Sequence, residues 1–251
     1  MKVIAFIPCR YGSNRFPGKP LVARIGGKSM IQCTYESAKS CSDITDVYVA
    51  TDDDRIAQCV RGFGGNAIMT GQEHPSGTDR VAEAARKCAL NPDDIVVNIQ
   101  GDQPYFHPSL ITDLIRPLQE DSDIPMSTLQ YRMTQEDEIQ HPNNVKTVSD
   151  RQGFALFFSR ATIPYYRDGE IHSLYFKHLG FYGYRMRFLE TFSRLAVTPL
   201  EEAEKLEQLR ALENGYRIMV IEVMHDSIEV DTPQDIRRVE AMMAQSGVSE
   251  S

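Results

Sequence analysis

The chain has 251 residues, of which 41% are hydrophobic and 25% are charged, so it can bury a full core and has the composition of a globular protein. Its 27 basic and 35 acidic residues give a net charge of −8, which argues against a general binder of nucleic acid or anionic membrane. No apolar run approaches the roughly 20 residues of a membrane span, and the N-terminus does not resemble a signal peptide. We therefore expect a cytoplasmic protein in which any phosphate ligand is held by a local cluster of cations.

The five cysteines are odd in number, contain no C-x-x-C pair and all lie in the first 88 residues. This pattern argues against a disulfide framework or a zinc site and favours small buried side chains. The cysteines are Cys9, Cys33, Cys41, Cys59 and Cys88.

In the first 120 residues, apolar strands alternate four times with helices. Strands are expected over 2–8, 46–51, 66–70 and 94–100, and helices over 29–41, 53–63, 78–89 and 108–118. Near-continuous apolar strands separated by helices predict an α/β fold with a doubly wound, mostly parallel sheet. In such sheets ligands bind beyond the carboxyl ends of the strands, where this chain carries its most polar segments.

After residue 121 the pattern changes to strands without long helices between them, which predicts an antiparallel extension. Strands are expected over 125–133, 145–150, 155–160, 178–185 and 217–223, and helices over 199–214 and 233–243. Neither a repeat nor a low-complexity linker interrupts the chain. The prediction is therefore one domain over residues 1–251, with residues 125–190 as an extension.

The segment Ile7–Leu21, IPCRYGSNRFPGKPL, follows the first strand and is rich in glycine and cations. It is not a Walker A motif, because five residues separate Gly12 from Gly18 and no hydroxyl residue follows Lys19. Guanidinium and ammonium groups in a glycine loop suit a nucleoside triphosphate, and a solvated surface loop is the alternative. The cations are Arg10, Arg15 and Lys19.

Three further motifs each allow a functional and a purely structural interpretation. Asp102, in a glycine turn after a buried strand, suits a magnesium ligand or a turn-capping side chain. Asp231, before Thr-Pro, suits a second metal carboxylate or a helix N-cap. The segment Ser76–Arg80, SGTDR, suits contact with a base or ribose, or helix capping. Together with the cation loop they predict a site for a metal–triphosphate.

These motifs, with further segments along the chain, resemble the 3-deoxy-D-manno-octulosonate cytidylyltransferases, also called CMP-Kdo synthetases. The resemblance runs from residue 4 to residue 240 and implies a Rossmann-like nucleotide-diphospho-sugar transferase fold. The RFPGK loop is shared with wider sugar nucleotidyltransferases, whereas the SR, HLGFYGY and LEQLR segments are specific to this branch. The matching segments are IPCRYGSNRFPGKPL, VATDDDRI, SGTDR, VNIQGDQP, ALFFSRATIP, KHLGFYGY, PLEEAEKLEQLR and VDTPQDI.

The resemblance implies that a sugar hydroxyl attacks the α-phosphorus of CTP and that pyrophosphate leaves. It implies phosphate contacts and catalysis by Arg10, Arg15 and Lys19, with Asp102 and Asp231 as ligands of Mg²⁺. It implies nucleotide contacts from Pro8, Arg10, Lys19, Ser76, Gly77, Arg80 and Gln100. It implies sugar contacts from Gln103, Arg160, His178, Tyr182, Tyr184, Glu207 and Gln208. Taken alone, His178 and the two tyrosines would be interpreted as core residues.

The expected mechanism is mainly positioning and charge stabilisation. A magnesium ion on the two carboxylates would lower the pKa of the attacking anomeric hydroxyl, and no strong general base stands out. Lys19 and Arg15 would stabilise the leaving pyrophosphate.

The chain departs from the usual family pattern at a few positions. Gln103 stands where most members have glutamate, Lys177 where arginine is usual, and Cys9 where alanine is common. These departures resemble a subgroup that takes 8-amino-3,8-dideoxy-manno-octulosonate (Kdo8N), although an ammonium group should prefer glutamate to glutamine. Kdo8N and ordinary Kdo both remain open.

Other interpretations are a cytidylyltransferase for another acid sugar such as a sialic acid, a non-catalytic nucleotide-sensing module, and a structural dimerisation protein. The sugar-side segments argue against the first, the retained Asp102 and Asp231 against the second, and the cation loop against the third. By family analogy we expect a homodimer formed through residues 125–190, a role in lipopolysaccharide biosynthesis, and neither nucleic-acid nor membrane partners.

Overall fold

The computed structural model describes residues 1–12, 18–167 and 174–245, which form two compact units. The first unit comprises Met1–Thr112 and the C-terminal segment from Ser227, and the second comprises Asp113–Asp226. The chain therefore leaves the first unit once and returns to it for its last helix.

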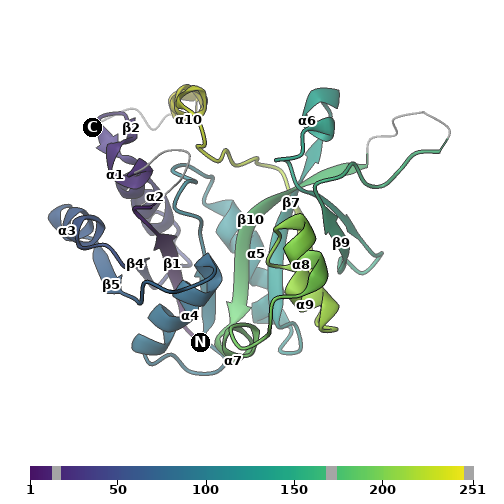
Figure 1. The fold of residues 1–251 in the computed structure, drawn as a ribbon, viewed down its shortest axis with the longest axis horizontal. Helices are drawn as coiled ribbons and strands as arrows, with labels where there is room; N and C mark the ends of the chain where they lie inside the picture. Colours follow the sequence, from purple (N-terminus) through teal and green to yellow (C-terminus); the bar gives the residue numbers. More distant parts are fainter. Residues whose placement is uncertain (13–17, 168–173, 246–251) are drawn as a thin grey trace. The chain divides into compact units, whose positions relative to one another are not determined.

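A four-stranded parallel sheet forms the centre of the first unit (Figure 1). Its strands lie in the order β6-β1-β4-β5. Four consecutive residues of β1, Ile4–Ile7, are at most 3% exposed, and because neighbouring side chains point to opposite faces, both faces are covered. The predicted α/β class is confirmed. The strands are β1 (Val3–Cys9), β4 (Asp46–Thr51), β5 (Asn66–Met69) and β6 (Ile95–Asn98).

The four predicted helices of this region are present, and each of their ends lies within two residues of its predicted position. Asp53 caps α3 by accepting a hydrogen bond from the backbone N–H of Arg55, and Ser76 caps α4 by accepting one from Asp79. The short helix α1 was not predicted. The helices are α1 (Lys19–Val22), α2 (Met30–Lys39), α3 (Asp54–Gly62), α4 (Gly77–Lys87) and α5 (Ser109–Glu120).

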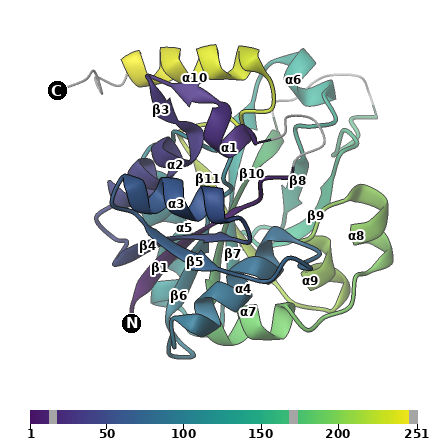
Figure 2. The ribbon, with the colours of Figure 1, turned by 60° about the vertical axis from the view of Figure 1, so that its left-hand side comes forward.

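The last helix, α10 (Pro233–Gln245), packs against the N-terminal hairpin of β2 (Arg24–Ile25) and β3 (Lys28–Ser29), as both ribbon views show (Figures 1 and 2). Val230 and Val239 are at most 1% exposed and join a cluster with residues of this hairpin and of α2. This apolar contact carries the C-terminal segment, and Asp231 with it, back to the start of the chain.

The second unit contains a mixed sheet in which β10 pairs antiparallel with β7 and β8, and β9 pairs antiparallel with β8. The antiparallel extension is therefore confirmed, while β11 pairs parallel with β7. The strands are β7 (Met126–Met133), β8 (Lys146–Ser149), β9 (Ala155–Ser159), β10 (Tyr175–Arg185) and β11 (Ile218–Val223). The helices are α6 (Glu136–Gln140), α7 (Met186–Phe192), α8 (Pro199–Glu204) and α9 (Leu209–Glu213).

The prediction of one continuous helix over residues 199–214 is wrong. Lys205 has a φ of 55°, in the left-handed region, and separates α8 from α9. At this break the carbonyl and carboxylate of Glu204 accept hydrogen bonds from Ser159 and Arg160 of the neighbouring strand end. These tertiary bonds compensate for the interrupted helix, and the break leaves Glu207 and Gln208 between the two helices.

All five cysteines are free thiols, and Cys9, Cys33 and Cys41 are buried, as their spacing predicted. Burial raises the pKa of Cys33 to about 11 and that of Cys41 to about 12, so both thiols are protonated near neutral pH. No helix in the described part of the chain is long and apolar enough to cross a membrane.

Gly183 of β10 offers a test of how tightly the second unit is packed. A methyl group at Gly183 would lie 2.6 Å from Ser127 Oγ and 2.9 Å from Leu118 Cδ1, closer than packed atoms allow. We expect Gly183→Ala to lower the free energy of unfolding by about 1–3 kcal/mol in a denaturant titration. Gly62→Ala is the control, because nothing lies within 4 Å of its added methyl group, and should be neutral or slightly stabilising. Equal effects of the two substitutions would contradict the close packing.

Candidate functional site

The opening loop leaves β1 at its carboxyl end and returns at α1. Arg10 lies directly after β1 and is exposed. Gly18 donates its backbone N–H to Tyr11 O at 3.0 Å and has a φ of 72°, a conformation that glycine adopts without strain. This bond closes the loop and starts α1 at Lys19. Arg15 lies outside the described residues.

Lys19 brings together two carboxylates that are 129 positions apart in the chain (231 − 102 = 129). Its Nζ lies 3.1 Å from Asp102 Oδ2 and 3.5 Å from Asp231 Oδ1, and it donates to Val230 O at 2.6 Å. The Lys19 side chain is 11% exposed, whereas those of Asp102 and Asp231 are 32% and 38% exposed. A mostly buried ammonium group thus holds two partly accessible carboxylates, as a bound cation could.

The backbone sets the position of Asp102. Gln103 N donates to Gln100 O, which closes a tight turn, and Val230 N donates to Asp102 O at 2.8 Å. A side chain at Gly101 would come within 3.1 Å of Pro8 O, so this turn packs directly against the end of β1. Gln103 itself is fully buried.

Asp231 precedes α10, but another carboxylate binds the amide groups there. Asp235 Oδ2 accepts from the backbone N–H groups of Asp231 and Thr232 at 3.1 and 2.8 Å. The carboxylate of Asp231 is directed towards Lys19 instead. Among the described residues, no group of three or more His, Cys, Asp or Glu side chains could hold a metal ion, so a metal here would depend on these two carboxylates and on ligand oxygens.

Pro8, Gly77 and Gln100 lie together at the carboxyl edge of the parallel sheet. A methyl group added to Gly77 would lie 3.4 Å from Pro8 Cγ and 4.0 Å from Gln100 Oε1. Ser76, next to Gly77, accepts from the backbone N–H of Asp79 and donates to its carboxylate. Helix capping by Ser76 is therefore present, and Gly77 packs against Pro8 at this edge.

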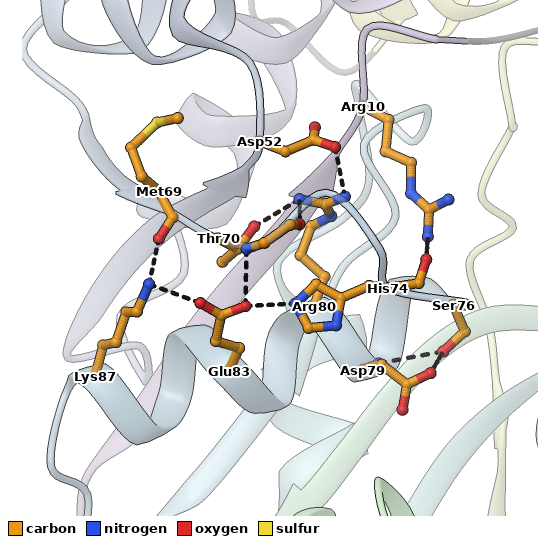
Figure 3. Close-up of polar contacts among 11 residues, drawn as sticks. Arg10, Asp52, Met69, Thr70, His74, Ser76, Asp79, Arg80, Glu83 and Lys87 are labelled. Atoms are coloured by element: carbon orange, nitrogen blue, oxygen red, sulfur yellow. Dashed lines mark hydrogen bonds and ion pairs between the residues drawn. The ribbon is translucent and has the colours of Figure 1, made fainter.

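Arg80, on α4 like Gly77, is fully buried, and its polar contacts are shown in Figure 3. Its guanidinium donates to Asp52 Oδ2 at 3.0 Å, Thr70 Oγ1 at 2.5 Å and Gly71 O at 3.2 Å. Asp52 belongs to the polar segment after β4, so Arg80 links two strand ends. Within the described residues its Nε has no hydrogen-bond partner.

In the second unit, a β-bulge brings His178 and Tyr182 together. Between these residues the register of β10 against β7 shifts, and Gly180 has a φ of 69°. In a regular strand residues four apart are about 13 Å apart, yet the two rings lie 5.3 Å apart. Tyr182 donates its hydroxyl to Gln208 Oε1 at 2.9 Å.

His178 is held as a neutral imidazole with a defined tautomer. Thr128 Oγ1 donates its only proton to Phe181 O at 2.7 Å, so at 2.8 Å His178 Nε2 must donate to Thr128. This leaves Nδ1 as an acceptor. Burial lowers the pKa of His178 to about 3.

The remaining residues that were predicted to contact a sugar divide into polar and packed ones. Arg160 Nε donates to Glu204 O at 2.7 Å and NH1 donates to Pro142 O at 3.2 Å. Gln208 is 1% exposed, and its Nε2 has no partner among the described residues. Glu207 is partly exposed beside it. Tyr184 is fully buried and stacks with Phe188, so its ring belongs to the aromatic core.

Several residues with important contacts were not singled out from the sequence. Thr128 orients His178, Glu204 holds Arg160, and Asp52 pairs with Arg80. Asp52 alone left a signal, since it stands in a run of acids after a buried strand. The partners of the other two come from distant segments, which no local pattern indicates.

Known proteins are similar to this chain over almost its full length. The family model described as Cytidylyltransferase matches residues 4–219. The 3-deoxy-manno-octulosonate cytidylyltransferase of Syntrophus aciditrophicus (strain SB) is 56% identical over 238 residues, which are 95% of this chain and 96% of that protein. The 8-amino-3,8-dideoxy-manno-octulosonate cytidylyltransferase of Shewanella piezotolerans (strain WP3 / JCM 13877) is 51% identical over 97% of this chain and 99% of its own.

A solved structure is similar over almost the full length. It is CMP:2-keto-3-deoxy-manno-octonic acid synthetase complexed with CTP, with a TM-score of 0.89 and 42% identity. The match covers 98% of this chain and 100% of that one.

The tautomer and charge of His178 can be measured directly. With a pKa of about 3, the imidazole should remain neutral and protonated at Nε2 from pH 8 down to pH 5 in ¹⁵N-resolved NMR of the folded protein. Because the unfolded state takes up this proton near pH 6.5 and the folded state does not, stability should fall as pH drops below about 6.5. His178→Gln should reduce that slope. A titration of His178 near pH 6.5 in the folded protein would refute the assignment.

Proposed function

The chain belongs to the 3-deoxy-manno-octulosonate cytidylyltransferases, and from that premise we propose which residues bind each substrate and which sugar acid the enzyme takes. It is a nucleotidyltransferase that activates Kdo or Kdo8N with CTP. The sugar hydroxyl attacks the α-phosphorus, the bond between the α-phosphorus and the bridging oxygen breaks, and pyrophosphate leaves. The product is the CMP-sugar acid used in lipopolysaccharide biosynthesis.

Nucleotide binding is assigned to the carboxyl edge of the parallel sheet. Arg10, Arg15 and Lys19 bind the phosphates as cations, because a local positive cluster is needed in a chain of net charge −8. Cytidine lies against Pro8, Ser76, Gly77 and Gln100, because Pro8, Gly77 and Gln100 lie together at this edge. Arg80 supports this surface through its hydrogen bonds to Asp52 and Thr70. Its Nε, which has no hydrogen-bond partner among the described residues, is assigned to the nucleotide.

The observation that carries this assignment is the position of Lys19 between Asp102 and Asp231. Two carboxylates that already share one cation are suitable ligands for Mg²⁺, which takes one or two carboxylates together with phosphate oxygens. A metal there would neutralise phosphate charge and acidify the attacking hydroxyl. Lys19 holds the carboxylates together before substrates bind, and it turns its ammonium group to the triphosphate once another cation takes its place.

The sugar acid is assigned to the polar residues of the second unit. Arg160 clamps the carboxylate, because a guanidinium group binds a carboxylate through paired hydrogen bonds. Neutral His178 accepts a sugar hydroxyl at Nδ1, and Tyr182, Glu207 and Gln208 bind other hydroxyls. Tyr184 supports Tyr182 by stacking at 6.0 Å rather than by contact with substrate.

Kdo8N is proposed as the preferred sugar, with Gln103 as the residue that sets the preference. Charge alone does not explain it, since an ammonium group gains more from a carboxylate, and relatives that are 51–56% identical carry either name. A cytoplasmic homodimer through residues 125–190 completes the proposal. The exposed apolar side chains of Leu156 and Leu174 in this range support it.

Pyrophosphate release from CTP and Mg²⁺, measured in parallel with Kdo and Kdo8N, tests the choice of sugar. We expect kcat/KM for Kdo8N to exceed that for Kdo by about tenfold or more, and Gln103→Glu to reduce this ratio. Equal or reversed values would assign Kdo instead, and release with neither sugar would remove the substrate class.

Asp102→Asn should lower kcat by at least about 10³-fold without changing the melting temperature by more than a few degrees, because the metal loses an anionic ligand. Asp123→Asn is the matched control, since Asp123 lies exposed in a turn of the second unit and its carboxylate has no hydrogen bond among the described residues. An Asp102→Asn enzyme that remained active and metal-dependent would refute the metal role.

The exchange of cations at Lys19 predicts that Lys19→Met binds divalent metal more tightly in the absence of nucleotide. The wild-type carboxylates must first release an ammonium group, so Mn²⁺ affinity in calorimetry should rise about tenfold in the variant, while CTP affinity falls. Lys28→Met removes a surface lysine paired with Glu36 and should change neither affinity. Weaker Mn²⁺ binding by Lys19→Met would contradict the exchange.

A further inference from the structure

The carboxylate of Glu83, on α4, accepts hydrogen bonds from the segment that precedes this helix (Figure 3). Glu83 Oε2 accepts from the backbone N–H of Gly71 at 2.9 Å and from Nε2 of His74, while Oε1 pairs with Lys87 Nζ at 2.7 Å. The side chains of His74 and Glu83 are only 19% and 23% exposed. Glu83 thus ties both ends of the segment 71–74 to the helix.

The ion pair keeps Glu83 ionised over a wide pH range. Burial by itself would raise the pKa of this carboxyl, but the hydrogen bonds from Lys87, Gly71 and His74 outweigh that effect and lower the pKa to about 2. Neighbouring contacts hold the start of this segment, because Arg80 donates to Gly71 O at 3.2 Å and Lys87 donates to Met69 O, two residues before it, at 2.6 Å. The segment is therefore held at its start as well as at His74.

The opposite side of His74 contacts the opening loop. The backbone carbonyl of His74 accepts a hydrogen bond from Arg10 NH2 at 2.7 Å. Among the described residues this is the only hydrogen bond of the Arg10 side chain. Arg10 is exposed, and a free arginine side chain samples many rotamers. The direction of its guanidinium group therefore depends on where the His74 carbonyl lies, and Glu83 determines that position.

We propose that Glu83 and His74 are positioning residues for the nucleotide phosphates, which act by holding the His74 carbonyl that orients Arg10. This inference rests on the proposed function, in which Arg10 binds the CTP phosphates. Neither side chain needs to contact substrate. By restricting Arg10 before CTP arrives, the cluster of Gly71, His74, Glu83 and Lys87 lowers the entropy lost when the phosphate contact forms.

If the cluster only stabilised the fold, the effects of Glu83 and Arg10 substitutions on CTP affinity would be independent of each other. If Glu83 only stabilised the fold, its loss would weaken CTP binding equally with and without the Arg10 side chain. If it acts through Arg10, the two losses are not additive, and a double-mutant cycle detects this.

The experiment measures CTP affinity by calorimetry with Mg²⁺ for the wild type, Arg10→Ala, Glu83→Ala and the double variant, with the melting temperature of each. We expect Glu83→Ala to weaken CTP binding about tenfold in the wild-type background and less than about twofold in the Arg10→Ala background. The KM for the sugar acid should stay unchanged. Glu36→Ala is the matched control, since Glu36 is an exposed helical carboxylate that accepts from Lys28 and Gln32 but holds no loop.

Two further variants keep the test decisive. Glu83→Gln can still accept from Gly71 and His74 through one oxygen and should restore CTP affinity close to that of the wild type. His74→Ala removes one bond only and serves if Glu83→Ala does not fold. Additive effects of Arg10→Ala and Glu83→Ala, or unchanged CTP affinity in Glu83→Ala and His74→Ala, would overturn the positioning role. Unchanged affinity in Arg10→Ala alone would instead refute the phosphate contact of the proposed function.

Discussion

The contact of the Lys19 ammonium group with Asp102 and Asp231 is the interaction on which the proposed nucleotide site depends. It joins the opening loop, the turn after β6 and the segment before α10. Two carboxylates this close would repel each other without a cation between them, so the arrangement needs either Lys19 or a metal. The return of the chain to its first unit supplies Asp231 for this contact. The packing of Val230 and Val239 against the N-terminal hairpin positions that residue.

Other charged groups of the first unit are held by protein partners. Arg80 is buried against Asp52, Asp53 caps α3 and Glu83 binds the segment before α4. Fixed charges of this kind need little reorganisation when a charged ligand binds, which favours binding and the stabilisation of charge in the transition state. An acidic protein can therefore bind a triphosphate through a few oriented cations.

In the second unit, irregular backbone creates the polar cluster. The bulge in β10 brings the rings of His178 and Tyr182 together, and the left-handed residue Lys205 places Glu207 and Gln208 between two helices. Each irregularity is compensated by hydrogen bonds from elsewhere, through Thr128 for His178 and through Arg160 for Glu204. Local conformational cost concentrated beside candidate binding residues is what functional sites commonly show.

The sequence by itself determined the α/β class, most helix and strand positions and the concentration of glycine and cations in the opening loop. Apolar patterning is a local property, so residues such as Ile4–Ile7 predicted their own strand. It also drew attention to Asp102 and Asp231, although each had an equally good local explanation as a turn or helix cap. Only the tertiary structure shows that Asp235 accepts the amide groups before α10 and that Lys19 lies between the carboxylates of Asp102 and Asp231. The bulge at Gly180, the break at Lys205 and the bond from Arg10 to His74 likewise depend on partners far away in the chain. No local pattern specifies those partners, since a contact between distant segments is decided by how the whole chain packs.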